Sequence, residues 1–133
     1  MDATEIFLRG VWKAIPDEDN LSWVEQLAKS EIKDTPLGDF GSLLKEMIDK
    51  GVSPYSIARF AKIIGYETAF GICYHLDDPI ASYEGFADNV EELSWGLFLV
   101  DEETYEPTES LHSLHETLLS LDPSGREMHP QNK

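Results

Sequence analysis

The chain's 133 residues are 41% hydrophobic and include three Trp, five Tyr and six Phe, which excludes an acidic disordered chain and predicts one folded domain. Ten Lys and Arg against 26 Asp and Glu give a formal charge of −16, which disfavours nucleic acid and anionic membranes as partners. A single cysteine, Cys73, excludes an intrachain disulfide framework and a multi-cysteine zinc cluster.

Apolar residues recur at helical spacing in three segments of the first half. The segments are residues 4–15, a second from the predicted cap Asn20 to a break at 35–38, and a third from Asp39 to the helix-stop Gly51. The residues expected to face inward are Phe7, Val11, Ala14 and Ile15 in the first, Leu21, Val24, Leu27, Ala28 and Ile32 in the second, and Phe40, Leu43, Leu44, Met47 and Ile48 in the third.

The sharpest local signal is the sequence GVSP at residues 51–54. It combines a helix-stop glycine, a serine cap and a proline at the first helical position, and so predicts two helices across a tight turn. The second of these, residues 54–76, is expected to be the central helix, because its latter half is apolar nearly all round. Small residues recur along it every four positions, at Ala61, Gly65, Ala69 and Cys73.

Beyond Pro79 the pattern is weaker. Residues 81–87 are typical of a loop, Asp88 or Asn89 is a candidate cap for a short helix, and residues 97–100 suit either a helix or a buried strand. Residues 101–110 are expected to form an acidic loop, and residues 110–121 a final amphipathic helix. The predicted fold is mainly α: a single domain over residues 1–125, with five or six helices bundled around residues 54–76, at most one short β element near 97–107, and a frayed tail at 126–133.

The charge is unevenly spread. Residues 63–125 contain no Lys or Arg and 14 Asp and Glu, whereas residues 1–62 carry −3 and residues 126–133 carry +1. The opening sequence MDATEIFLRG has acids where a signal peptide has basic residues, and the longest weakly charged stretch, 63–76, is too short to span a bilayer. We therefore expect a cytoplasmic protein.

Glu67 is a candidate buried carboxylate, with Tyr74 and His75 as partners for acid–base chemistry. The alternative, which we favour, is a structural carboxylate hydrogen-bonded to a neighbouring group. Cys73 lies among the small residues of the central helix, and a buried core thiol is favoured over a nucleophile.

A second candidate site is His112, His115 and Glu116. Imidazoles three residues apart share a helix face and could ligate a divalent metal, with His75 and Asp77 or Asp78 as further ligands. The spacing differs from the HExxH metalloprotease motif, and boundary histidines beside a leucine stripe are the favoured interpretation. No phosphate-binding loop, nucleophile elbow or EF-hand pattern is present in the sequence.

The leading functional hypothesis is a non-enzymatic protein–protein interaction module that docks a basic partner through its acidic half. In size and charge the chain is similar to the immunity proteins of bacterial nuclease toxins, a similarity of composition and not of motif. Two alternatives stay open: a metal-binding protein or metal-dependent enzyme using the histidine pair, and a homodimer without catalytic activity. The partner-binding residues expected are Glu91, Glu92, Asp101, Glu102, Glu103, Glu106 and Glu109, with Tyr83, Phe86 and Tyr105 as aromatic anchors.

Overall fold

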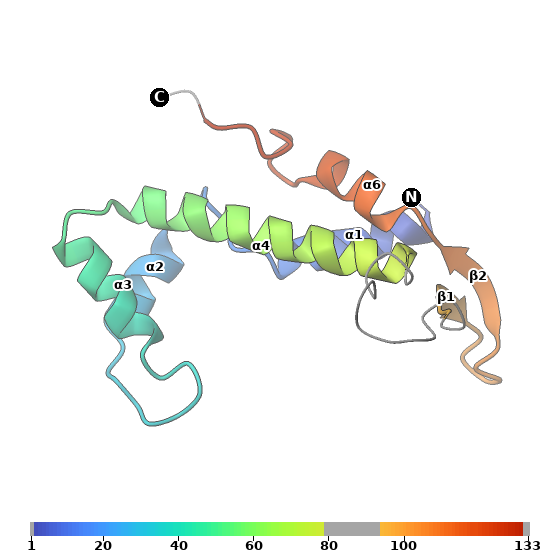
Figure 1. Ribbon diagram of the computed structural model, residues 1–133, viewed down its shortest axis with the longest axis horizontal. Coiled ribbons are helices and arrows are strands. Elements are labelled where there is room, and N and C mark those ends of the chain that lie inside the picture. The colour runs from blue at the N-terminus through green and yellow to red at the C-terminus, as the bar shows by residue number, and fades with distance from the viewer. Residues whose placement is uncertain (1, 79–93, 132–133) are drawn as a thin grey trace, which may run out of the picture. The chain divides into compact units, whose positions relative to one another are not determined.

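The computed structural model describes residues 2–78 and 94–131, and shows a mainly helical chain with one short two-stranded antiparallel sheet (Figure 1). The chain divides into two compact units. One is the continuous unit, Ile15–Gly65, and the other is the split unit, which joins Met1–Ala14 to Tyr66–Lys133. The mainly helical fold is confirmed, while the bundle and the single domain over residues 1–125 stay predictions. Within the described residues, no helix is long and apolar enough to cross a membrane.

The continuous unit contains α2 (Ser22–Ala28), α3 (Phe40–Asp49) and the first half of α4 (Pro54–Asp77). Its core is formed by buried apolar side chains that these three helices contribute at helical spacing. The fully packed members are Val24, Leu44, Ile57 and Ala58, and Leu21, Trp23, Leu27, Ala28 and Ile48 pack partly buried against them.

The turn between α3 and α4 confirms the signal in the sequence. Gly51 has a φ of +94°, a left-handed conformation that favours glycine, and its N–H donates to the carbonyl of Ile48 at 2.9 Å. Ser53 then caps α4, because its Oγ accepts the backbone N–H of Ser56 at 3.1 Å. Local sequence alone is therefore enough to begin α4 at Pro54.

Glu18 of the continuous unit lies in a buried ionic cluster with Arg59 and Lys62. Glu18 is 2% exposed, and its Oε1 lies 3.3 Å from Nη1 of Arg59 and 3.6 Å from Nζ of Lys62. Both cations project from α4, three residues apart, and so share one face of the helix. These are the last basic residues before the stretch that has none, and Glu18 was not among the residues predicted to be buried.

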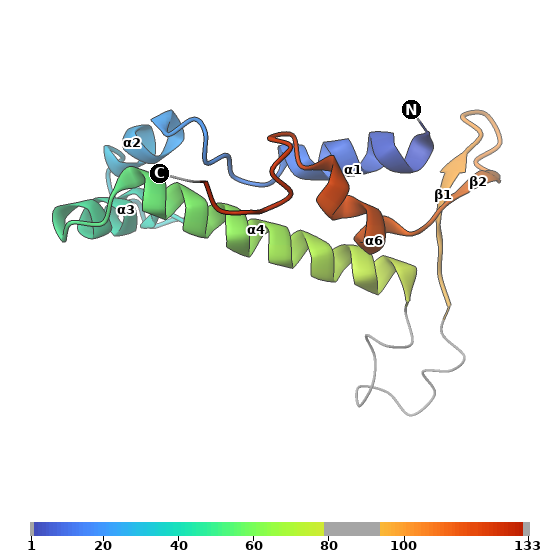
Figure 2. The same cartoon turned by 90° about the horizontal axis from the view of Figure 1, so that it is seen from above.

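The split unit combines α1 (Ala3–Lys13), the second half of α4, strands β1 (Leu97–Val100) and β2 (Pro107–Leu111), α6 (Leu114–Leu118) and a 3-10 turn η2 (Leu119–Leu121). Figure 2 shows α1 beside α6, and the buried Nε1 of Trp12 donates to the carbonyl of Leu118 at 2.9 Å. Leu8, Cys73 and Leu114 are also buried in this unit. The burial of Cys73 agrees with the core thiol predicted for it.

Two expectations for these helices are corrected. The buried residues of α1 are Leu8 and Trp12, one position on from the predicted face, because the Trp12 indole reaches into the unit and bonds to Leu118. Phe7 and Val11 are half-buried, and Ala14 is exposed. In α2 the helix ends at Ala28, which leaves Ile32 exposed and outside it.

The predicted helix over residues 110–121 is also wrong at its beginning. Ser110 pairs with Phe98 in the sheet, and Ser113 has a φ of 56°, which no α-helix accommodates, so the helix begins at Leu114. Further on, the buried carboxylate of Asp122 accepts the N–H groups of Ser124 and Met128 at 3.0 and 3.1 Å. These bonds hold the chain as far as residue 128, within the segment predicted to be a frayed tail.

Candidate functional site

The acidic residues expected to bind a partner are carried largely by residues 97–111, which we call the acidic hairpin. Strands β1 and β2 pair antiparallel with Leu97 opposite Leu111, Phe98 opposite Ser110 and Leu99 opposite Glu109, and a bulge follows at Val100 (Figure 1). The predicted β element near 97–107 is confirmed in β1, whereas Pro107–Leu111 form a strand where a loop was expected.

Asp101 organises the turn of the acidic hairpin. Its Oδ1 accepts the backbone N–H groups of Glu103 and Thr104 at 2.9 and 3.0 Å. Its own N–H donates to the carbonyl of Glu106 at 2.9 Å. The two hydrogen bonds that the carboxylate accepts, the larger effect from the backbone N–H of Thr104 and the smaller from that of Glu103, stabilise the ionised form and lower the pKa of Asp101. The hydrogen bonds of the turn therefore favour the charged form of Asp101.

The acidic hairpin places charge and apolar surface side by side. All five of its acids are exposed, and its sequence contains no Lys or Arg. Exposed apolar side chains accompany them: Phe98, Leu99 and Val100 are 45, 42 and 48% exposed, and Tyr105 is 76% exposed. The five acids are Asp101, Glu102, Glu103, Glu106 and Glu109, while Glu91, Glu92, Tyr83 and Phe86 of the predicted interface lie outside the described residues.

The charge asymmetry of the sequence follows the division into units. The split unit contains four Lys and Arg and 17 Asp and Glu, a formal charge of −13, whereas six and nine such residues give the continuous unit −3. A basic surface is therefore attracted mainly to the split unit. A small apolar cavity of about 320 Å³ lies in the same unit, where Ile6 and Phe7 of α1 face Phe98 and Leu99 of β1.

His115 is held by a carboxylate from α4. Asp77 Oδ2 accepts the backbone N–H of His115 at 3.0 Å and contacts its Nδ1 at 2.5 Å. The carboxylate therefore caps the beginning of α6 from 38 residues away, because Ser113, the residue at the N-cap, makes no such bond. The imidazole also packs against Tyr74 and Phe70, with ring centroids 4.6 and 5.6 Å away. These contacts of His115 connect α6 to the second half of α4 and give the histidine a structural role.

The predicted metal ligands are not brought together. His112 is exposed and contacts Ser113, and only His115 and Glu116 approach one another, with Nε2 and Oε1 3.8 Å apart. In residues 2–78 and 94–131, no three His, Cys, Asp or Glu side chains are grouped so that they could hold a metal ion. Of the further ligands considered, Asp77 pairs with His115, and the backbone carbonyl of His75 accepts the indole N–H of Trp95.

Glu67 is exposed, so the expectation of a buried carboxylate is corrected: the side chain lies at the surface beside Tyr66 and Phe70. The buried positions on this half of α4 are taken by Ala69 and Cys73, while Tyr66 is half-buried and stacks on Trp12 at 5.8 Å. Burial, with the nearby charge of Asp77, raises the pKa of Cys73 to about 11. A thiol with that pKa is protonated at neutral pH and is a poor nucleophile.

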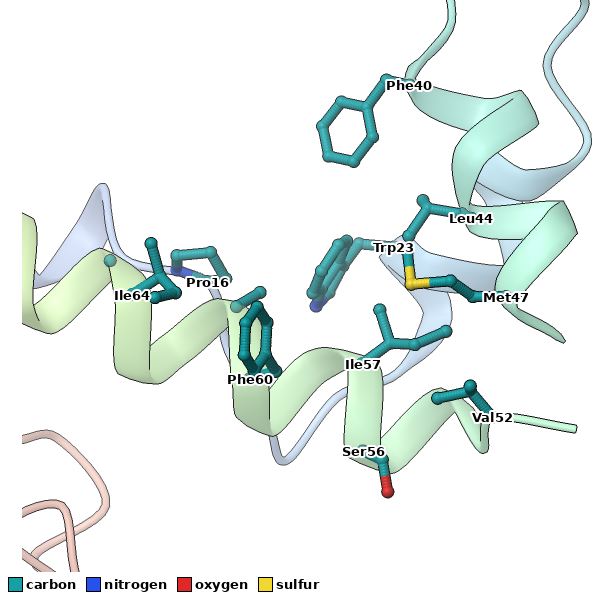
Figure 3. A pocket seen from close by; sticks show the side chains of 12 residues that line it. Pro16, Trp23, Phe40, Leu44, Met47, Val52, Ser56, Ile57, Phe60 and Ile64 are labelled. Atoms are coloured by element: carbon teal, nitrogen blue, oxygen red, sulfur yellow. The ribbon is translucent and has the colours of Figure 1, made fainter. Parts of the chain in front are cut away.

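The continuous unit has an apolar groove of about 740 Å³, which we call the α3–α4 groove. Figure 3 shows Phe40 and Met47 from α3 on one side and Phe60 and Ile64 from α4 on the other, with Trp23 between them. Phe40, Leu43 and Met47 were expected to face inward, but all three are exposed, and Phe40 and Met47 line this groove. The spacing of apolar residues predicts which face of α3 is apolar, but it does not distinguish positions in a core from positions that line a groove.

Comparisons of the chain with protein-family models, with curated proteins and with solved structures found no match.

Proposed function

We propose that the protein is an interaction module that docks a basic protein partner through the acidic hairpin. The observation that carries this proposal is the combination on one short hairpin of five exposed carboxylates, no cation and four exposed apolar or aromatic side chains. Interfaces commonly combine aromatic anchors with a charged rim, which is the combination found here.

The physical role of the acids is to steer and select. A charge of −13 on the split unit raises the rate of encounter with a cationic surface and repels anionic competitors. The apolar side chains supply the contact area that slows dissociation once the partner has docked. Because the hydrogen bonds of Asp101 define the turn, little ordering of this loop accompanies binding.

The test is affinity capture from a lysate of the native cells with the wild-type chain and two matched variants. The first, Glu102→Lys/Glu103→Lys, reverses two exposed acids of the acidic hairpin. The control, Glu31→Lys/Asp34→Lys, makes the same change of charge at exposed positions of the continuous unit. Each capture is repeated at about 0.1 and about 1 M salt, because the screening length falls from about 10 to about 3 Å over that range.

We expect one stoichiometric basic protein to bind the wild type and the control at low salt, and to be lost at high salt and with the hairpin variant. Equal capture by the two variants would refute a docking role for the acidic hairpin. Capture that is indifferent to salt would refute the electrostatic argument.

A second candidate function, a homodimer, is favoured by the α3–α4 groove. The continuous unit carries only −3, so two copies that meet through it repel one another far less than two split units would. The exposed apolar residues of the groove supply a contact area. Sedimentation of the wild type and of Phe60→Glu distinguishes the two candidates: a dimer that the substitution dissociates supports this one, and a concentration-independent monomer refutes it.

A further inference from the structure

Strand β1 has an outer edge beside which the described residues place no strand. The sheet contains β1 and β2 in that order, so each strand is paired on one side and presents backbone N–H and C=O groups on the other. Such an edge is a template on which another extended chain can pair.

The two edges of this sheet differ. Strand β2 begins with Pro107, which has no N–H, and carries the charged Glu109, and both features oppose the addition of a strand. Strand β1 has the sequence LFLV, with neither proline nor charge, and three of its four side chains are exposed. Among the residues that the structure describes, the edge of β1 is therefore the one open to pairing.

Charge decides which chain can take that place. A second copy of this protein would bring another acidic hairpin, with five more carboxylates, against the first. A cationic extended segment would instead meet carboxylates at the turn and apolar side chains along the strand. The small cavity between α1 and β1 can also receive one apolar side chain of such a segment.

We propose that an extended, basic peptide segment of the partner adds to the edge of β1 as a third strand. In the antiparallel orientation, the amino-terminal residues of the segment lie opposite Val100 and the acidic turn, and later residues lie opposite Leu97. The segment therefore carries its Lys and Arg before a run of about four residues of high β propensity, since β1 is four residues long. This inference rests on the proposed function and specifies its mode of binding.

The probes are two synthetic peptides of identical composition, KRKVTVI and VTVIKRK, each with a fluorescent label, and a third in which alternate amide nitrogens of KRKVTVI are methylated. Fluorescence anisotropy at about 0.1 M salt gives the affinities. Hydrogen exchange of residues 97–100 and 107–111, followed by NMR, reports which backbone amides the peptide protects.

We expect KRKVTVI to bind at least tenfold more tightly than VTVIKRK, and methylation to abolish binding. Exchange should slow in β1 and remain unchanged in β2. Replacing Phe98 and Val100 by Thr keeps the β propensity and removes the apolar contacts, and should weaken binding about tenfold.

Equal binding of the two peptide orders without protection of β1 would overturn strand addition, while leaving electrostatic docking through the acidic hairpin intact. Failure of all three peptides to bind would also overturn strand addition, and the capture experiment would then decide the proposed function separately. Protection of β1 that grows with protein concentration in the absence of peptide would identify a second copy at the edge, and so would overturn the proposal.

Discussion

Replacing Glu18 by Gln should destabilise the protein severely, because the substitution keeps the shape of a buried side chain and removes its charge. The side chain of Glu18 is 0% exposed, and Arg59 and Lys62, whose side chains are 16 and 5% exposed, lie 3.3 and 3.6 Å away. In the variant, both cations stay in the interior without the carboxylate that they face. Removing the charge of one member of a buried ionic cluster weakens the compensation of the charges that remain buried.

The magnitude follows from the distances. At an effective dielectric constant of about 20, a unit charge pair at these separations contributes about 5 kcal/mol, so the two contacts together contribute about 10 kcal/mol. The cost of burying the carboxylate, several kcal/mol, offsets much of this attraction. We expect the free energy of unfolding to fall by about 3–5 kcal/mol, a large share of the stability of a domain of this size.

Urea unfolding followed by circular dichroism measures the change. The control is Glu46→Gln, the same substitution at an exposed carboxylate 3.2 Å from Lys50, for which we expect a loss below about 1 kcal/mol. Equal, small losses in the two variants would show that the buried cluster contributes no more than a surface ion pair and would refute the reasoning.

Two glycines of α4 should respond to alanine with opposite signs. Gly71 has open space where a Cβ would lie, so Gly71→Ala should raise the free energy of unfolding by about 0.5–1 kcal/mol. At Gly65 a Cβ would lie 2.9 Å from a ring carbon of Pro16, so Gly65→Ala should lower the free energy of unfolding by about 1 kcal/mol. Urea unfolding that gives the same sign for both variants would contradict this. The buried thiol of Cys73 should react with a disulfide reagent at pH 8 only through unfolding, so labelling should accelerate with urea, and fast labelling of the native protein would be inconsistent with its raised pKa. Because the pKa of Cys73 rises from 9.0 to about 11 on folding, the contribution of the buried neutral thiol to the free energy of unfolding is complete below about pH 9 and is lost as the pH approaches 11. The lowered pKa of Asp101 has the opposite effect: the ionised carboxylate stabilises the hairpin turn above pH 3.8, and this stabilisation is lost as the pH falls through the lower pKa of the folded state. An NMR titration of the Asp101 carboxyl carbon should give a midpoint below 3.8. A midpoint at or above 3.8 would contradict the hydrogen bonding.

The features that the sequence predicts correctly are those that local chemistry determines. Residues 51–54 stop one helix and begin the next through a positive φ, a serine cap and a proline, and none of these depends on a distant partner. The long apolar run that follows predicts α4 almost to its last residue. The buried face of α1 was predicted one residue too early in the helix, because the hydrogen bond from Trp12 to a carbonyl 106 residues away decides which side of α1 is buried.

The parts that were missed depend on pairing across the chain. The sequence PTESL at residues 107–111 has no apolar alternation and becomes a strand because β1 lies beside it. Glu18 stands between the exposed acids Asp17 and Asp19, and its burial beside Arg59 and Lys62 depends on residues about 40 positions later in the chain. For the candidate site, the exposed acids of residues 101–109 were predicted from charge alone, but the apolar edge of β1 required the geometry of the sheet.

The split unit has a consequence for synthesis on the ribosome. Its first segment, ending at Ala14, leaves the exit tunnel before any of the continuous unit, and its remaining residues leave after all of it. Leu118, whose carbonyl accepts the Trp12 indole N–H, is made 106 residues after that tryptophan. The continuous unit can therefore complete its core while the chain is still growing, but Trp12 of α1 can make this bond only after Leu118 has been made. The packing of α1 against α6 is thus a late step of folding, separated from the synthesis of α1 by the 106 positions from Trp12 to Leu118.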